Sequence, residues 1–216
     1  MKILNRNVLK IIALITMLID HIGLVFFPGI EIFRIIGRIS FPIFAFMIAE
    51  GYKYTKSRKK YLGLLLLFGL ISEPIYVFAF HLYSLNILFT FALSIILIYL
   101  IENYHKNKTD YSMYLMIYFV AIICLSVFNL IDYGFYGILL PVIFYFFKDN
   151  DLKYLIISLI TMLYSLIFTT IQIYSLIALV LIYMYNNQKG KYNLKYLFYI
   201  SYPTHILLLG LIALII

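Results

Sequence analysis

Four ionisable side chains near the start of the sequence could carry out chemistry in apolar surroundings. Asp20 and His21 interrupt the apolar stretch of residues 8–27, and Arg34 and Arg38 follow after a Pro-Gly pair. His21 is the candidate general base, because an imidazole titrates closest to neutral pH. Arg34 and Arg38 are four residues apart and would share one face of a helix. Such a pair of guanidinium groups suits a phosphate, a carboxylate or a developing oxyanion.

Asp20 and His21 are sequence neighbours, which sets their side chains about 100° apart on a helix. We therefore expect Asp20 to pair with an arginine and not with His21. A purely structural role is the alternative, since a histidine in a membrane helix is often only a polar contact between helices. The two arginines could likewise do no more than form ion pairs with Asp20, Glu31 or Asp132. Residue type and spacing leave both roles open.

The composition indicates a membrane protein. Of the 216 residues, 65% are hydrophobic and 12% are charged. Soluble domains contain about 25% charged residues and about half apolar residues. An apolar excess of this size cannot be buried in a soluble core of this length. We predict an all-α fold, a polytopic bundle of membrane helices that forms one integral-membrane domain over residues 1–216.

About nine transmembrane helices account for the apolar stretches, since a spanning helix needs roughly 17–25 mainly apolar residues. The predicted helices cover residues 8–27, 37–54, 61–80, 85–101, 111–128, 136–147, 154–185 (two helices) and 196–216. Residues 154–185 are too long for one crossing at about 1.5 Å per residue, so a turn is predicted near Gln172. A single helix there would leave eight crossings and fit the charges less well. Pro42 predicts a kink in the second helix.

The net charge of +8 could indicate a nucleic-acid partner, but the positions of the basic residues argue against one. Fifteen of the seventeen Lys and Arg residues lie in short gaps on one side of this predicted bundle. The distribution follows the positive-inside rule. We therefore expect a cytoplasmic N-terminus, a C-terminus outside, contacts with membrane lipids and no binding to nucleic acid. Only Arg34 and Arg38 would lie on the outer side.

Most other polar groups fall in the outer half of the predicted bundle or at its outer mouth. They are Glu73, Asn86, Thr90 and Asp132, joined by Tyr202 and His205 near the middle of the last helix. Only Glu50 lies toward the cytoplasm. Polar residues inside membrane segments are costly and mark functional sites by default. We expect them to line one cavity that opens outward. The four histidines lack metal-binding spacing, so no metal site is expected.

Six motifs occur in order along most of the chain. They are MLIDHIG (17–23), FRIIGRISFPIFAFMIAEGYKYT (33–55), LISEP (70–74), LNILFT (85–90), DYGFYG (132–137) and FYISYPTHILLL (198–209). The pattern GRxxFPxFxF within the second motif is the most specific. Together the six motifs resemble the TraX family of membrane proteins.

The resemblance implies an activity. The named member of the family is associated with N-terminal acetylation of conjugative pilin. The family is similar to the integral-membrane acyltransferases, in which a histidine of the first helix, here His21, is assigned the catalytic role. The implied protein is an acetyltransferase of the bacterial cytoplasmic membrane with acetyl-CoA as donor. Its acceptor would be an amine or hydroxyl of a protein N-terminus or a glycan.

In this hypothesis Asp20 assists His21, while Arg34 and Arg38 bind the donor or stabilise the oxyanion. The closing YPTH, which contains Tyr202 and His205, has counterparts in the wider acyltransferase group. The alternative is a membrane protein without enzymatic activity, either a transporter or an assembly scaffold. The same charges would then form an ion-pair network.

Overall fold

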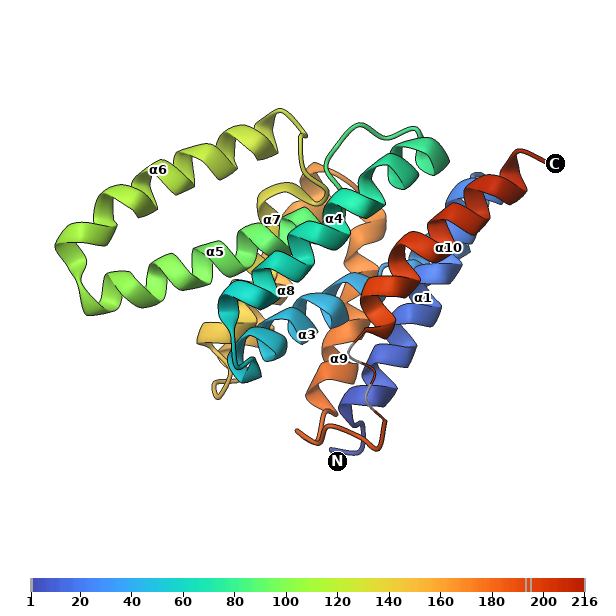
Figure 1. Ribbon diagram of the computed structural model, residues 1–216. Helices are drawn as coiled ribbons and strands as arrows, with labels where there is room; N and C mark the ends of the chain where they lie inside the picture. The colour runs from blue at the N-terminus through green and yellow to red at the C-terminus, as the bar shows by residue number, and fades with distance from the viewer. Residues whose placement is uncertain (1, 193, 195, 216) are drawn as a thin grey trace.

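The computed structural model describes residues 2–192, 194 and 196–215, and helices make up most of it (Figure 1). No strand occurs among these residues, and two isolated bridges join Leu4 to Tyr185 and Leu85 to Ile131. The predicted all-α class is confirmed for this part of the chain. Lys195, one of the basic residues that support the predicted topology, lies outside the described residues.

The first helix, α1 (Arg6–Phe26), begins at a side-chain cap and ends before a proline. The side chain of Asn5 accepts a hydrogen bond from the backbone N–H of Val8, which satisfies a free donor of the first turn. Pro28 disfavours the helical conformation for the residue before it. The helix therefore stops at the Pro-Gly pair, as the sequence predicts.

Two helices, α2 (Glu31–Gly37) and α3 (Ser40–Tyr54), form one nearly continuous segment. The break between them lies at Arg38 and Ile39, slightly before the predicted kink at Pro42. Pro42 occupies the first turn of α3, where its missing N–H has no helical partner to lose. Twelve of the fifteen residues of α3 are buried, so this helix forms the centre of the bundle.

The remaining helices follow the predicted order. They are α4 (Arg58–Phe80), α5 (Ile87–Lys106), α6 (Lys108–Val127), α7 (Gly134–Phe146), α8 (Leu152–Ile167), the 3₁₀ helix η1 (Thr170–Leu176), α9 (Ile177–Tyr183) and α10 (Leu197–Ala213). The chain breaks at Phe168 and Thr169, between α8 and η1, so the predicted division of residues 154–185 is confirmed. Gln172 lies just after this break, in η1.

Four helical segments are long and apolar enough to cross a membrane, namely α1, α2–α3, α4 and α5. Five shorter apolar segments complete the described part of the chain, and the total equals the predicted nine. Length and composition alone do not establish nine crossings or their orientation, which stay predictions.

The surface of the bundle is apolar. Large apolar side chains are exposed along α6, α8 and α10, among them Val127 at 69% and Leu166 at 81%. In Figure 1 the connecting end of the α5–α6 hairpin projects from the bundle, whereas the rest of α5 packs against α4 and α7. Extended apolar surface of this kind is suited to lipid and not to water. These features indicate a membrane-associated protein.

Glu50, whose role the sequence leaves open, lies buried at the end of α3 with an exposed fraction of 4%. Its carboxylate lies 3.4 Å from the guanidinium of Arg6 and 3.3 Å from the ammonium of Lys148. A buried charge needs such partners to offset its desolvation. These ion pairs join the start of α1, the end of α3 and the turn after α7.

Candidate active site

A cavity of about 160 Å³ lies among α1, α2, α3, α4, α5, η1 and α10. It is lined by six of the predicted site residues: Asp20, His21, Arg34, Arg38, Asp132 and Tyr202. Tyr76, Phe80, Tyr133 and Gln172 also line it. The fold therefore brings the ionisable groups of α1 and α2 to one cavity, which Asp132 and Tyr202 also line although they are far away in sequence.

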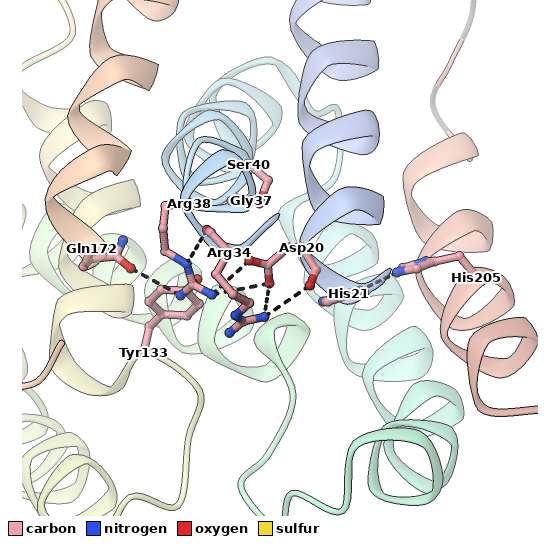
Figure 2. Close-up of polar contacts among 9 residues, drawn as sticks. All are labelled: Asp20, His21, Arg34, Gly37, Arg38, Ser40, Tyr133, Gln172 and His205. Atoms are coloured by element: carbon pink, nitrogen blue, oxygen red, sulfur yellow. Dashed lines mark hydrogen bonds and ion pairs between the residues drawn. The ribbon is translucent and has the colours of Figure 1, made fainter. Parts of the chain in front are cut away.

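Asp20 is the centre of an ion-pair cluster with Arg34 and Arg38, which we call the Asp20 cluster (Figure 2). An Arg34 guanidinium N–H donates to Asp20 Oδ2 at 2.6 Å, and an Arg38 N–H donates to Asp20 Oδ1 at 3.0 Å. Asp20 and Arg38 are each 8% exposed. The expected pairing of Asp20 with an arginine is confirmed. One carboxylate offsets only one of the two guanidinium charges.

The geometry of α2 places the two arginines side by side. Arg38 follows the last residue of α2, and its backbone N–H donates to the carbonyl of Arg34 at 3.1 Å. The Arg38 Nε also donates to that carbonyl, at 3.3 Å. This i, i+4 relation holds the two guanidinium groups on one face, as their spacing predicts.

Glycines allow α1 and α2 to approach closely. A Cβ on Gly37 would overlap the carboxylate of Asp20, and a Cβ on Gly23 would overlap the Cβ of Phe33. Small residues let helix backbones pack at short range. Gly37 is therefore the residue that makes room for the Asp20 carboxylate beneath α2.

His21 contacts His205, and we call these two residues the histidine pair (Figure 2). The distance from His21 Nδ1 to His205 Nε2 is 2.6 Å, and His205 Nδ1 lies 2.5 Å from the carbonyl oxygen of Ser201. The ring of Phe80 packs on His21 at 4.9 Å between centroids, and that of Tyr202 lies at 6.5 Å. His21 lines the cavity, whereas His205 lies on α10 and contacts His21 without being among the lining residues.

Two further residues belong to the site although the sequence analysis did not select them. Tyr133 and Gln172 accept hydrogen bonds from Arg38, at 3.1 Å to the phenolic oxygen and 3.4 Å to the amide oxygen. Tyr133 has φ 59°, which is uncommon for a bulky residue and marks a position held by its surroundings. Gln172 is fully buried. In the sequence, Gln172 could have been recognised as a polar side chain within an otherwise apolar stretch.

Besides His205, three predicted residues support the cavity but are not among the described residues that line it. Glu73 Oε2 accepts hydrogen bonds from the Asn86 backbone N–H at 3.0 Å and from its side chain at 2.6 Å. Asn86 in turn caps α5. The hydroxyl of Thr90 donates to the backbone carbonyl of Asp132 at 2.8 Å, which holds the turn before α7.

Asp132 is the second carboxyl that lines the cavity, and it lies in the turn between α6 and α7. Burial raises the pKa of this carboxyl to about 6, while Arg38 acts in the opposite direction. When Asp132 is ionised, it offsets the remaining positive charge of the Asp20 cluster. When it is protonated, the cavity keeps one net positive charge.

The sequence comparisons place the chain among known proteins. The model of the TraX protein family matches residues 5–213, almost the whole chain. The chain belongs to the TraX family. One relative is the probable fimbrial assembly protein FimC, serogroup H1, of Dichelobacter nodosus. It is 26% identical over 243 residues, which covers 95% of this chain and 97% of the relative.

A second relative, the uncharacterized protein RP591 of Rickettsia prowazekii (strain Madrid E), is 29% identical over 135 residues. That match covers 60% of this chain and 50% of the relative. No solved structure matches the chain. The assignment to the TraX family therefore rests on sequence, and the geometry of the cavity is the information added by the structure.

Proposed function

We propose that this TraX-family protein is a membrane acyltransferase that transfers an acetyl group from acetyl-CoA to an amine or hydroxyl acceptor. The observation that carries the proposal is that His21 and the two arginines of the Asp20 cluster line one cavity. A general base and a fixed cationic group are the two elements that acyl transfer to a nucleophile requires.

The proposed reaction uses His21 to take a proton from the acceptor as its nitrogen or oxygen attacks the thioester carbonyl carbon. A tetrahedral intermediate forms, and its oxyanion is stabilised by Arg34 or Arg38. The intermediate collapses when the carbon–sulfur bond breaks. The thiolate that leaves takes the proton back from His21, so the base is regenerated and no metal or redox step is involved.

The size of the cavity supports a small transferred group. A cavity of about 160 Å³ is close to the roughly 150 Å³ engineered cavity that holds benzene in another protein. An acetyl thioester with the attacking atom of an acceptor is of that size, whereas the nucleotide of acetyl-CoA is much larger. The nucleotide would therefore stay outside the cavity, and the thioester end would reach His21 between the helices from the cytoplasmic side.

The name of one relative supports a choice of acceptor class. The Dichelobacter nodosus relative is named as a probable fimbrial assembly protein. A fimbrial or pilin-like subunit would supply a free N-terminal amine, and a surface glycan would supply a hydroxyl. We favour the amine, because a neutral amine is a better nucleophile than a neutral hydroxyl.

The test uses purified protein in lipid nanodiscs, labelled acetyl-CoA, and acceptor peptides with free or blocked N-termini. We expect label on the free peptide only, and His21→Gln should lower turnover by at least about 10²-fold. His105→Gln is the matched control, because this exposed histidine lies at the end of α5, outside the cavity lining. An active, folded His21→Gln protein would overturn the assignment of the base.

An assembly scaffold is the second candidate, and the name of the fimbrial relative favours it. Assembly on a scaffold would require the folded protein but not the imidazole of His21. Cells that carry His21→Gln would then assemble fimbriae normally, whereas cells without the protein would not. The acyltransferase proposal requires unacetylated subunits in both strains, which mass spectrometry of the subunits detects.

A further inference from the structure

The contact between His21 and His205 has a more specific geometry than a packed pair of rings. The ring planes are inclined by only 4°, and the ring centroids are 4.9 Å apart. That separation is about the largest that a 2.6 Å contact between His21 Nδ1 and His205 Nε2 permits. The two rings therefore lie edge to edge in nearly one plane, with both nitrogens on the line between the centroids. This is the arrangement of an imidazole–imidazole hydrogen bond, in which an N–H points at an in-plane lone pair.

The carbonyl of Ser201 decides which nitrogens carry protons. A carbonyl oxygen can only accept a hydrogen bond, so His205 Nδ1 must be the donor at 2.5 Å. A neutral imidazole has one N–H, so Nε2 of neutral His205 carries a lone pair. His21 Nδ1 must then be the donor to His205 Nε2. The remaining nitrogen of His21, Nε2, has no proton and is free to accept one.

We infer that His205 is a positioning residue that fixes His21 as the Nδ1–H tautomer and so makes His21 Nε2 the atom that accepts the proton. The inference deepens the proposed function and rests on it for the role of His21 as a base. His205 touches neither donor nor acceptor in this scheme. It acts through His21, as the aspartate of a Ser-His-Asp triad orients the histidine base.

The histidine pair also gives the proton's positive charge a second location. When His21 Nε2 takes a proton from the acceptor, the Nδ1 proton of His21 can pass to His205 Nε2. His205 then becomes the imidazolium, its Nδ1–H still donates to Ser201, and His21 is neutral again. When the proton returns to the leaving thiolate from His21 Nε2, the proton on His205 passes back. No proton is gained or lost by the pair over one cycle.

This transfer moves the positive charge away from the arginines. Figure 2 shows the Asp20 cluster on one side of His21 and His205 on the other. Two cations close together in a poorly solvated cavity repel strongly, and the repulsion falls as their separation grows. A charge held on His205 is therefore less costly than one held on His21, next to Arg34.

Two variants of His205 separate positioning from packing. In His205→Gln the side-chain amide oxygen can still accept from His21 Nδ1–H. In His205→Leu the side chain fills similar space but has no acceptor. We expect kcat to fall about 10²-fold in His205→Leu with KM unchanged, and to stay within about 10-fold of wild type in His205→Gln. His105→Leu is the matched control, because it makes the same substitution at an exposed histidine outside the cavity lining.

A spectroscopic measurement tests the tautomer without any need for turnover. Protein labelled with ¹⁵N-histidine is examined by NMR under conditions in which both rings are neutral, and His21 is assigned by its absence in His21→Gln. We expect protonated Nδ1 and unprotonated Nε2 for His21 in wild type. His205→Leu should shift His21 toward the Nε2–H tautomer, whereas His205→Gln should preserve the wild-type pattern.

The outcomes are distinguishable from those of the proposed function. A His21 that carries its proton on Nε2 in wild type overturns the inference, and so does wild-type kcat in a folded His205→Leu protein. If wild type transfers no acetyl group to any acceptor, the proposed function fails. The NMR pattern still decides whether His205 sets the tautomer.

Discussion

Asp20 is buried and pairs with two arginines. Its negative charge therefore contributes more to stability than the packing of its side chain. In Asp20→Asn both guanidinium groups would lose their carboxylate while Arg38 stays buried. Removal of one member of a buried ion pair costs about 3–5 kcal/mol, so we expect that loss of stability. Thermal melting in detergent, followed by circular dichroism, measures it. Asp149→Asn is the control because Asp149 is exposed, and an equal loss in both variants would contradict the role of the cluster.

Asp132 predicts a pH-dependent stability. Its folded-state pKa, about 6, lies above the ordinary value of 3.8, so the folded state holds this proton more tightly than the unfolded state. The stabilisation that this proton gives to the folded state is complete below about pH 4 and is lost as the pH rises through about 6. We therefore expect wild type to lose stability relative to Asp132→Asn across this range, by at most about 3 kcal/mol. Melting temperatures of both proteins at pH 4 to 8 provide the test, and parallel curves would refute the raised pKa.

Local spacing predicted some site contacts and not others. The 100° offset between Asp20 and His21 predicted that the two side chains contact different partners. The i, i+4 spacing predicted that Arg34 and Arg38 lie side by side. Arg38 also contacts Tyr133 and Gln172, which are 95 and 134 residues away. No periodicity relates residues that distant, and only the packing of η1 and the turn before α7 against α2 brings them together. The contact of His21 with His205, which are 184 residues apart, could not be predicted from the sequence for the same reason.

The contact between α1 and α2 depends on a missing side chain. In Gly37→Ala the new methyl group would overlap the Asp20 carboxylate, so one of the two helices must shift. We expect a destabilisation of about 1–3 kcal/mol, typical of overpacking, together with loss of turnover because both arginines move. Melting and activity assays measure the two effects.

Gly63→Ala is the matched control for this glycine. Gly63 is an exposed residue of α4, and no atom lies within 4 Å of the position of its Cβ. Alanine is the better helix former, so stability should be unchanged or higher by up to about 1 kcal/mol. A loss at Gly63 as large as that at Gly37 would show that the α1–α2 contact is not the cause.

At the level of helices, apolar length was a reliable guide. It predicted the division of residues 154–185 and the nine apolar segments in order, but not the separate helix α2. The helix break before α3 was predicted a few residues late, because a proline is tolerated in a first turn and the bend instead follows the packing of Arg38. The left-handed Tyr133 at the start of α7 had no sequence signal, since glycine and asparagine are the residues that usually mark this conformation.

The orientation of the whole molecule can be tested with single cysteines. Cys124 is the only cysteine, so Cys124→Ser gives a background without thiols. Gly29→Cys lies in the exposed turn after α1, and Lys56→Cys lies in the exposed turn between α3 and α4. If the N-terminus is cytoplasmic, a membrane-impermeant maleimide added to intact spheroplasts should label the cysteine at position 29 and not that at 56. The reverse pattern would invert the bundle and place the cavity at the cytoplasmic end.

Two sets of ion pairs, at Arg6 and at Asp20, limit how α1 can move. Arg6 joins α1 to α3 through Glu50, and Asp20 joins it to α2 fourteen residues later, about 21 Å along the axis. A slide of α1 by one turn would break both connections at once and leave buried charges without partners. Alternating access by rocking or sliding of this helix is therefore unfavourable. On the proposed function, the substrates would instead come to this fixed site from opposite faces of the membrane.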